Sequence, residues 1–322
     1  MRVVSAEDID RALSFPALIA ALADAFRGGI TAPPRHHHTI PRPEGDATLL
    51  LMPAWTEGPP TADFIGVKIV SVVPGNAAAG VPSVQGTYLL SDPRGTPLAA
   101  LDGTRLTLWR TAAASALAGR ELARADASRM VMVGAGALAP YLVRAHASVR
   151  PLSDIAIWAR RPASAKAVAD CLGGEGLPAR ATENLERAVG EAHLVSCATL
   201  ATAPLVRGAW LASGTHLDLV GAFTPAMREA DDEALTRASL YVDTDAALTE
   251  GGDVAVALKS GAIGRGAVRG TLGDLVSGRV PGRTSSEEIT AFKSVGASLE
   301  DLAAAMLVWR KLGAAGAPED AS

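Results

Sequence analysis

The sequence predicts an α/β protein with a central doubly wound domain, and two patterns along the chain support this class. After residue 128, short apolar strands alternate with helical segments, which is typical of a parallel sheet covered by helices. Before residue 105, strand-like runs follow one another between glycine and proline clusters, as in an antiparallel sheet. The alanine-rich segment Arg105–Arg124 is expected to form a helix that connects the two regions. The change of pattern therefore predicts two domains.

Composition disfavours several functional classes. The chain has 322 residues, of which 48% are hydrophobic and 20% charged, an ordinary balance for an enzyme. A net charge of −4 argues against a nucleic-acid surface, which needs excess cations. No uncharged apolar run reaches the roughly 18 residues of a membrane span, and acids stand where a signal peptide would be basic and then apolar. Because Cys171 and Cys197 lack metal-like or redox spacing, we expect a cytoplasmic protein.

The N-terminal segment is expected to be helical. Ser5 and Asp8 resemble a capping box, and the apolar spacing over Ile9–Phe26 predicts one or two helices with an interruption near Ser14. A proline-rich loop is expected over Thr31–Gly45, and it contains three adjacent histidines, 36–38. Neighbouring side chains point in different directions, so these histidines cannot all face one metal ion, and we predict no metal site.

Three strands are expected next. They are separated by glycine and proline clusters, and the last leads through a turn at 92–95 into another short strand. Their predicted bounds are Ala47–Trp55, Asp63–Val73 and Val84–Ser91.

The central motif is a glycine-rich turn that directly follows a buried strand. The apolar run Met130–Val133 leads into Gly-Ala-Gly-Ala-Leu-Ala at 134–139 and then into helical sequence. In the doubly wound nucleotide fold, such small residues allow a sharp turn, a close approach to a pyrophosphate and tight packing of the helix on the strand. A plain strand-to-helix turn would have a similar sequence. The motif nevertheless predicts a dinucleotide site that includes Gly134, Gly136, Ala137, Leu138 and Ala139.

The second strand of this unit bears on cofactor choice. It is expected over Asp154–Trp158, and an NAD-selective site usually has an acidic residue at its end to hold the ribose hydroxyls. Here the chain has Arg160 and Arg161, whose guanidinium groups suit a 2′-phosphate. The alternative is a solvated arginine pair at a helix start. We expect NADP(H) to be preferred, with NAD(H) as the alternative.

Further strands are expected at His193–Ala198, His216–Val220 and Leu240–Asp243, each followed by a loop at the ligand-binding edge of a parallel sheet. The stretch 288–312 predicts a strand, a tight turn at 294–296 and an amphipathic helix opened by Ser298 and Asp301. A helix this apolar must pack against something, and we predict that it returns to the N-terminal domain.

Seven short segments together resemble the ornithine cyclodeaminase and mu-crystallin family. They occur in the family's order over nearly the whole chain: PPR at 33–35, LMPAW at 51–55, GVKIV at 66–70, WRTAAASALA at 109–118, VGAGALAP at 133–140, PGR at 281–283 and EITAFKSVGASLEDLAAA at 288–305. The resemblance implies a homodimer, a Rossmann domain over 125–296, and a substrate-binding and dimerisation domain formed by 1–124 and 297–322. It also implies hydride transfer at the carbon beside the carboxylate of a small amino or imino acid.

The resemblance also assigns site residues. Arg35, Lys68 and Arg110 match the basic residues that hold the substrate carboxylate, and we expect Lys68 and Arg110 to be catalytic. Taken singly, Lys68 has the pattern of an exposed strand residue and Arg110 that of a helix-surface charge. The positions that match cofactor contacts are Ser83, Thr111, Thr199, Val220, Gly221, Ala222 and Val295.

The chain departs from the cyclodeaminases in the segment VGAFTPAMRE at 220–229. Phe223 stands where those enzymes have an aspartate, and Met227 stands where they have a lysine that contacts the substrate. Eliminating ammonia needs a carboxylate near the amino groups, whereas an apolar wall suits the methylenes of a ring. The segment resembles the branch that reduces pyrroline-2-carboxylate to proline and piperideine-2-carboxylate to pipecolate. The alternatives are an ornithine cyclodeaminase, an alanine dehydrogenase-like enzyme and a non-catalytic, crystallin-like binding protein.

Overall fold

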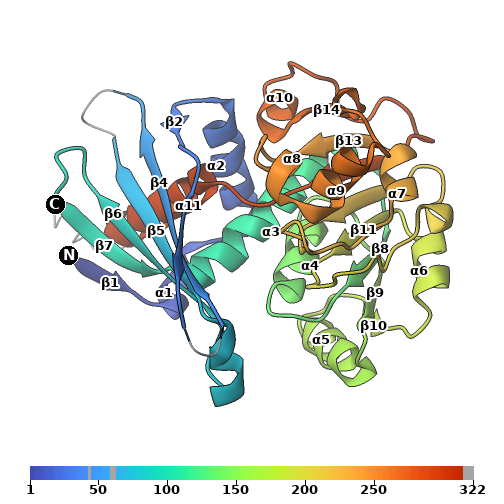
Figure 1. Ribbon diagram of the computed structural model, residues 1–322, viewed down its shortest axis with the longest axis horizontal. Coiled ribbons are helices and arrows are strands. Elements are labelled where there is room, and N and C mark those ends of the chain that lie inside the picture. Colours follow the sequence, from blue (N-terminus) through green and yellow to red (C-terminus); the bar gives the residue numbers. More distant parts are fainter. Residues whose placement is uncertain (43–44, 59–62, 315–322) are drawn as a thin grey trace, which may run out of the picture. The chain divides into compact units, whose positions relative to one another are not determined.

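The structure, a computed structural model, describes residues 1–42, 45–58 and 63–314 (Figure 1). The chain divides into two compact units, one formed by 1–110 with 297–322 and the other by 111–296. The division falls inside helix α3 (Gly103–Leu122), whereas we expected it after residue 124. The helix is continuous through this point, so no break in the sequence pattern marks the division.

The first unit contains one seven-stranded sheet. Strands β4, β5, β6 and β7 form the predicted antiparallel series, and β1 adds to β7 in parallel at one edge, which we did not predict. The bounds are β1 Arg2–Val4, β2 Ile30–Thr31, β3 His36–Ile40, β4 Ala47–Thr56, β5 Ile65–Val72, β6 Val84–Ser91 and β7 Pro97–Asp102.

The prediction of a loop over Thr31–Gly45 is wrong for part of that segment. The three histidines lie in β3, which pairs antiparallel with the first half of β4. Strand β2 pairs only with the last two residues of β4, so most of that edge is open to β3. The histidine side chains are exposed. Among the described residues, no three histidine, cysteine or acidic side chains gather as metal ligands would.

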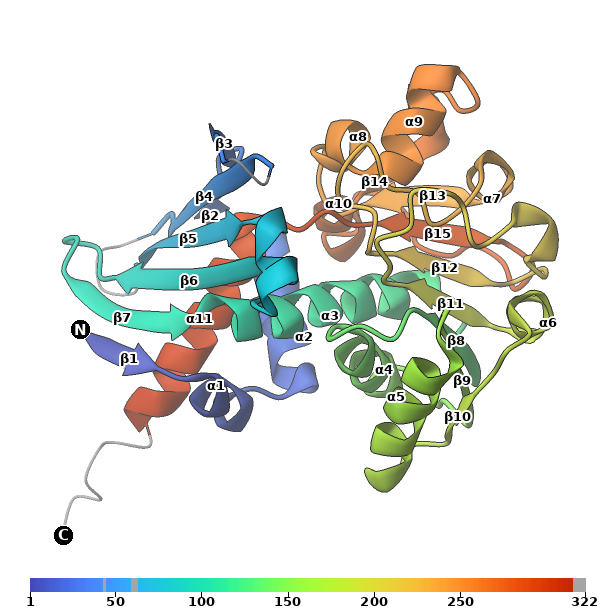
Figure 2. The same ribbon diagram turned by 60° about the horizontal axis from the view of Figure 1, so that its bottom comes forward.

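Helices cover one face of this sheet. Helices α1 (Ala6–Ala12) and α2 (Phe15–Arg27) confirm the interrupted N-terminal helix, and the Ser5–Asp8 capping box is present. The final helix α11 (Ser298–Ala314) packs against α2 and along β4, β5 and β6 (Figures 1 and 2), which confirms that it returns to the N-terminal region. The short 3-10 helix η1 (Pro74–Ala79) precedes β6.

The second unit contains an eight-stranded sheet in the order β10-β9-β8-β11-β12-β15-β13-β14, with every neighbouring pair parallel. This confirms the doubly wound α/β prediction. Because all the strands run the same way, their carboxyl ends share one edge. The bounds are β8 Arg129–Val133, β9 Asp154–Trp158, β10 Ala179–Ala181, β11 Leu194–Cys197, β12 His216–Leu219, β13 Ser239–Val242, β14 Val268–Thr271 and β15 Thr290–Lys293. Strands β10 and β14 were not predicted.

Helices pack on both faces of this sheet. Helices α4 and α5 lie on one face, and α6 and α7 lie on the other (Figures 1 and 2). The second face contains a continuous apolar core in which strand residues such as Val195 and Leu217 meet Val189 of α6 and Leu235 of α7. No helix in the described part of the chain is both long and apolar enough to cross a bilayer. The remaining bounds are α4 Ala139–Ala147, α5 Pro162–Gly174, α6 Leu185–Glu191, α7 Asp232–Thr236, α8 Ala247–Glu250, α9 Gly252–Ser260, α10 Leu272–Val276, η2 Gly208–Trp210 and η3 Arg265–Ala267.

Candidate functional site

The first unit buries a cluster of charged side chains between its sheet and α11. Lys68 of β5 is 2% exposed and Arg110 of α3 is 6% exposed, so neither is the surface residue that its sequence context alone allowed. The cluster also contains Glu300 and Asp301, which are fully buried in the first turn of α11. Charges this deeply buried are tolerated only when they are paired.

The pairing centres on Asp301. Lys68 Nζ donates to Asp301 Oδ1 at 2.9 Å and lies 2.8 Å from Oδ2. Arg110 Nε donates to Asp301 Oδ1 at 3.1 Å, and Arg110 Nη1 donates to Glu300 Oε2 at 2.8 Å. Helix α11 therefore fixes both cations through its first turn. The sequence predicts that Asp301 opens the helix; in the structure its carboxylate also holds the two cations.

The electrostatics of this cluster favour an additional anion. Burial and the neighbouring Arg110 charge lower the pKa of Lys68 to about 8, although Asp301 opposes that shift. Arg35, which is half-buried just before β3, also lowers the pKa of Lys68. A substrate carboxylate beside these cations would oppose the lowering of the Lys68 pKa.

The second unit has a backbone turn that suits a dinucleotide. Gly134 ends β8 with φ +117°, and a Cβ at this position would lie 2.5 Å from the carbonyl oxygen of Ala198. Only glycine fits there. A Cβ on Gly136 would instead meet no atom within 4 Å, and Gly136 and Ala137 are exposed. The turn thus has the tight first glycine and the open second position that a pyrophosphate requires.

The other predicted cofactor positions of this unit occur mainly at the same edge of the sheet. Arg160 and Arg161 are exposed between the end of β9 and the start of α5. The residues that follow β11, β12 and β15 are Thr199, Val220 to Ala222, and Val295, respectively. Since these strands are parallel, the structure brings their carboxyl ends to one edge.

Two predicted cofactor residues do not belong to this edge. Thr111 lies in the middle of α3, and Ser83 lies in the first unit just before β6. The carbonyl of Ser83 accepts a hydrogen bond from Val73 N at 2.7 Å. Their roles therefore stay predictions.

A buried carboxylate joins two of the loops at this edge. Glu229 is fully buried, and its Oε1 accepts hydrogen bonds from Thr199 N at 2.6 Å and Thr199 Oγ1 at 2.9 Å. Its Oε2 accepts from Gly221 N at 2.7 Å and Ala222 N at 3.2 Å. One side chain thus receives four hydrogen bonds from the loops that follow β11 and β12.

Two further buried aspartates hold neighbouring backbone. Asp253 of α9 accepts from Glu229 N at 2.7 Å and from Lys293 Nζ at 3.1 Å. Asp243, at the end of β13, accepts from Val295 N at 2.7 Å and Gly296 N at 2.6 Å through Oδ2. The loops after β11, β12 and β15 are therefore tied to buried acids.

In the loop after β12, neither of the two positions at which the chain differs from the cyclodeaminases is acidic. Phe223 is 42% exposed, and Met227 is half-buried. The carboxylate beneath this loop belongs to Glu229, whose oxygens are already occupied by four donors. Glu229 is therefore unsuited to exchange protons with a substrate in the way that the missing aspartate would.

Sequence reasoning missed the five acids that organise these sites, Glu229, Asp243, Asp253, Glu300 and Asp301. The sequence feature that could have indicated them is an acidic residue within an apolar stretch, as at 300–301 between Leu299 and Leu302. Such acids are usually paired when buried, but the sequence does not name the partner.

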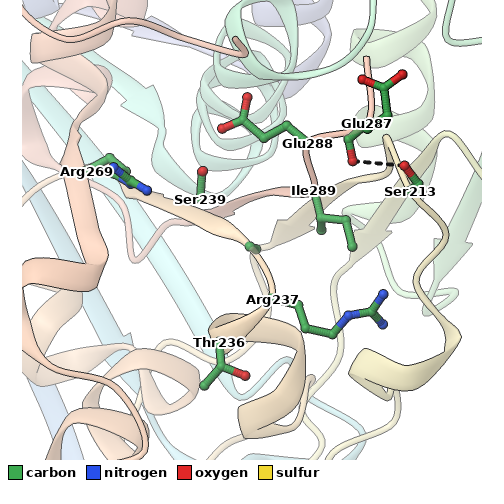
Figure 3. Close-up of a pocket in the computed structure, with 9 residues that line it drawn as sticks. Ser213, Thr236, Arg237, Ser239, Arg269, Glu287, Glu288 and Ile289 are labelled. Atoms are coloured by element: carbon green, nitrogen blue, oxygen red, sulfur yellow. Dashed lines mark hydrogen bonds between the residues drawn. The ribbon is translucent and has the colours of Figure 1, made fainter. Parts of the chain in front are cut away.

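A hollow of about 490 Å³ also opens in the second unit, and its position excludes it as the cofactor site. Figure 3 shows its lining residues near the start of β13 and β15, including Arg237, Ser239 and Ile289. On its rim, the Ser213 hydroxyl donates to the Glu287 carbonyl at 3.0 Å (Figure 3). This is the amino edge of the sheet, whereas doubly wound folds bind ligands at the carboxyl edge.

Comparison with known proteins agrees with this arrangement. Residues 2–315 match the model of the ornithine cyclodeaminase/mu-crystallin family. A Delta(1)-pyrroline-2-carboxylate reductase of Paracoccus denitrificans is 39% identical over 290 residues, which cover 89% of this chain and 90% of that protein. The structure of a Thermococcus litoralis Delta(1)-pyrroline-2-carboxylate reductase in complex with NADH and L-proline superposes with a TM-score of 0.92 at 32% identity, covering 98% of both chains. An archaeal alanine dehydrogenase dimer with bound NAD gives 0.89 at 30% identity, covering 98% of this chain and 97% of that chain.

Proposed function

Because the chain belongs to the ornithine cyclodeaminase/mu-crystallin family, we propose that it reduces cyclic 2-imino acids with a reduced nicotinamide cofactor. Its substrates are pyrroline-2-carboxylate, which gives proline, and piperideine-2-carboxylate, which gives pipecolate. The activity is that of an oxidoreductase acting on a C=N bond. The relatives named for this reaction support the proposal, as does the geometry of the two units.

The observation that carries the proposal is the buried pair formed by Lys68 and Arg110. Asp301 holds both side chains at hydrogen-bond distance, so their positions are set before substrate arrives. With Arg35, which acts on the same Lys68 ammonium, they form the group of cations that would bind the substrate carboxylate. A fixed grip on the carboxylate orients the neighbouring carbon, which is the carbon to be reduced.

The chemistry then needs little from the protein beyond binding and orientation. The nicotinamide cofactor, when bound, supplies the hydride that adds to C2. Gly134 and Gly136 would hold the pyrophosphate through the turn after β8, and Thr199 and Ala222 would contact the nicotinamide end. In the protonated imine the nitrogen already has its proton, so no side chain has to deliver one. Lys68 and Arg110 keep the carboxylate in place throughout.

The loop after β12 favours reduction over ammonia loss. Phe223 offers an apolar, 42% exposed ring where a cyclodeaminase has a carboxylate, and Glu229 beneath it is occupied by backbone donors. Elimination of ammonia needs an acid that exchanges protons with the amino groups. A ring of methylenes instead gains from contact with an apolar wall.

We further propose that NADPH is preferred to NADH. The support is the pair Arg160 and Arg161, both exposed at the end of β9, where an acidic residue would select NADH. Guanidinium groups bind a 2′-phosphate with paired hydrogen bonds.

We also propose that the protein is a cytoplasmic homodimer that associates through the face of the first sheet opposite α11. Trp55 and Ile65 on that face are 39% and 44% exposed, and Leu51 and Val67 beside them are half-buried. Such an apolar patch on a sheet is typical of an interface between subunits. Both cysteines are free thiols, as expected in a reducing compartment.

The test is a substrate panel on the purified protein. Pyrroline-2-carboxylate and piperideine-2-carboxylate should each consume NADPH, which is followed by its absorbance. Ornithine with NAD⁺ should release no ammonia, and pyruvate with ammonium should be a much poorer substrate pair than the cyclic imines. Consumption with neither ring would reject the proposal, and NADPH binding without turnover would favour a crystallin-like binding protein.

A further inference from the structure

Glu229 occupies a position that the proposed reaction does not explain. It is fully buried in irregular backbone after β12. A buried carboxylate is costly unless its oxygens are hydrogen-bonded. Glu229 meets this requirement with three backbone N–H groups and one hydroxyl, all from the loops after β11 and β12.

These two loops approach each other very closely. A Cβ on Gly221 would lie 2.2 Å from both the N and the O of Thr199, and 2.5 Å from Glu229 Oε1. The backbones thus meet at a point where only glycine fits, and the carboxylate bridges them. Backbone N–H groups that converge from two loops need a shared acceptor, since they have no strand partner beyond the end of the sheet.

The segment that contains Glu229 is itself fixed by hydrogen bonds to Asp253. Asp253 accepts from the backbone N–H of Glu229 and pairs with the fully buried Lys293 of β15. Asp253 also accepts from Ala230 N at 3.0 Å. Strand β15, helix α9 and the Glu229 segment therefore fix the side chain that bridges the other two loops.

We propose that Glu229 is a positioning residue that sets the shape of the nicotinamide-binding loops by joining Thr199 to Gly221 and Ala222. The inference rests on the proposed function, because those three residues are among the predicted cofactor contacts. Glu229 acts through them, because both of its carboxylate oxygens already accept hydrogen bonds from these loops. Its charge matters, since an ionised carboxylate accepts from all four donors, whereas a neutral amide or acid presents a hydrogen to some of them.

The first test measures NADH binding by fluorescence titration with Glu229→Gln. The amide has the same shape, so the fold should persist, but its NH₂ group faces N–H donors. We expect NADH to bind about tenfold or more weakly, which corresponds to the loss of one or two charge-assisted hydrogen bonds. Glu191→Gln, at the exposed end of α6 just before β11 in the same unit, is the matched control and should bind NADH as the wild type does. Binding by Glu229→Gln within twofold of the wild type would overturn the proposal.

The second test uses the unmodified protein. Burial raises the pKa of Glu229 to about 7, while Lys293 lowers it and Asp253 raises it. If protonation weakens the bridge, NADH should bind about tenfold more weakly near pH 6 than near pH 8, because only about a tenth of Glu229 is ionised at the lower pH. The Cys197 thiol faces the same group, but burial raises its pKa well above its usual value, so it stays neutral. NADH binding by Glu229→Gln should not depend on pH in this way. If NADH binding by the variant changed with pH as it does in the wild type, the proposal would be contradicted.

Hydrogen exchange of the cofactor-free protein separates this inference from the proposed function. Glu229→Gln should speed amide exchange in the loops at 199–204 and 220–228 by tenfold or more, while the exchange of β8 and β9 stays the same. If the wild type binds neither NADPH nor NADH, the proposed function fails and the exchange result still decides the role of Glu229. If the wild type binds NADH and exchange in both loops is unchanged, only this inference fails.

Discussion

Replacing Lys68 with methionine tests the proposed carboxylate grip most closely. Methionine keeps much of the apolar stem and removes the ammonium that lies 2.8 Å from Asp301 Oδ2. A charge-assisted hydrogen bond to a substrate carboxylate is worth about 1.5–3 kcal/mol. Its loss predicts that kcat/KM for pyrroline-2-carboxylate falls by a factor of about 10 to 150. NADH binding should stay within about twofold, because the change does not alter the glycine-rich turn.

The same substitution removes one of the two cations that pair with the buried Asp301 carboxylate, so stability has to be measured together with activity. Removing one partner of a buried ion pair costs about 3–5 kcal/mol in the free energy of unfolding. Arg110 still pairs with Asp301, so we expect the lower end of that range. The double variant Lys68→Met/Asp301→Asn removes the stranded charge and should recover part of the stability while activity stays low.

The assay therefore combines steady-state kinetics, NADH titration and denaturant unfolding on the wild type and both variants. Near-normal kcat/KM in Lys68→Met would refute the proposed grip. Recovery of activity in the double variant would show that Lys68 acts only through stability. Loss of NADH binding together with activity would show that the substitution disturbs more than the carboxylate site.

Three further predictions follow from the same structure. Replacing Arg160 and Arg161 together by alanine should weaken NADPH binding by tenfold or more and NADH binding by less than threefold, as measured by titration; equal losses would mean that these arginines do not bind the 2′-phosphate. Because the pKa of Lys68 is lowered to about 8 and the protonated form grips the carboxylate, kcat/KM should fall as the pH rises through about 8. The fall should occur at the same pH with both ring sizes if it belongs to the enzyme, and at different pH values if it belongs to the substrates. Leu51→Glu, on the outward face of β4, should convert the proposed dimer to a monomer in size-exclusion chromatography with light scattering, and a dimer mass that is unchanged by the substitution would place the interface elsewhere.

Much of the second unit could be predicted because its signals are local. The buried strand at Met130–Val133, the small residues at 134–139 and the regular spacing of later strands each reflect a short-range requirement of the parallel sheet. The structure places β9 at Asp154–Trp158, as predicted, and β12 within one residue of the prediction. Short edge strands such as β10 and β14 have three or four residues, too few for a clear periodic pattern.

The parts that could not be predicted depend on contacts between distant residues. The histidine segment forms a strand because one edge of β4 is open to it, and nothing in a proline-rich sequence indicates that edge. The pairing of Lys68 with Asp301 joins positions 233 residues apart. Sequence resemblance identified the cations, but their partners became evident only when α11 was placed on the sheet.

The bridge at Glu229 shows the same limit at the second site. The segment 220–229 stands out in the sequence because it lacks an acid at Phe223, and nothing in the sequence indicates a role for the acid at its end. Its partners lie on two loops, the farther of them 30 residues away at Thr199. Burial and hydrogen bonds, which the sequence does not contain, reveal its function in the fold.

The most direct test of the central claim uses an isotope label to follow the hydride from the cofactor to the substrate. Pyrroline-2-carboxylate is incubated with the purified protein and with reduced cofactor that carries deuterium at the transferable position of the nicotinamide. The account predicts proline with one deuterium at C2, formed in equal amount to the oxidised cofactor. Proline that forms from ornithine with release of ammonia, while the cyclic imine is left unreduced, would contradict it.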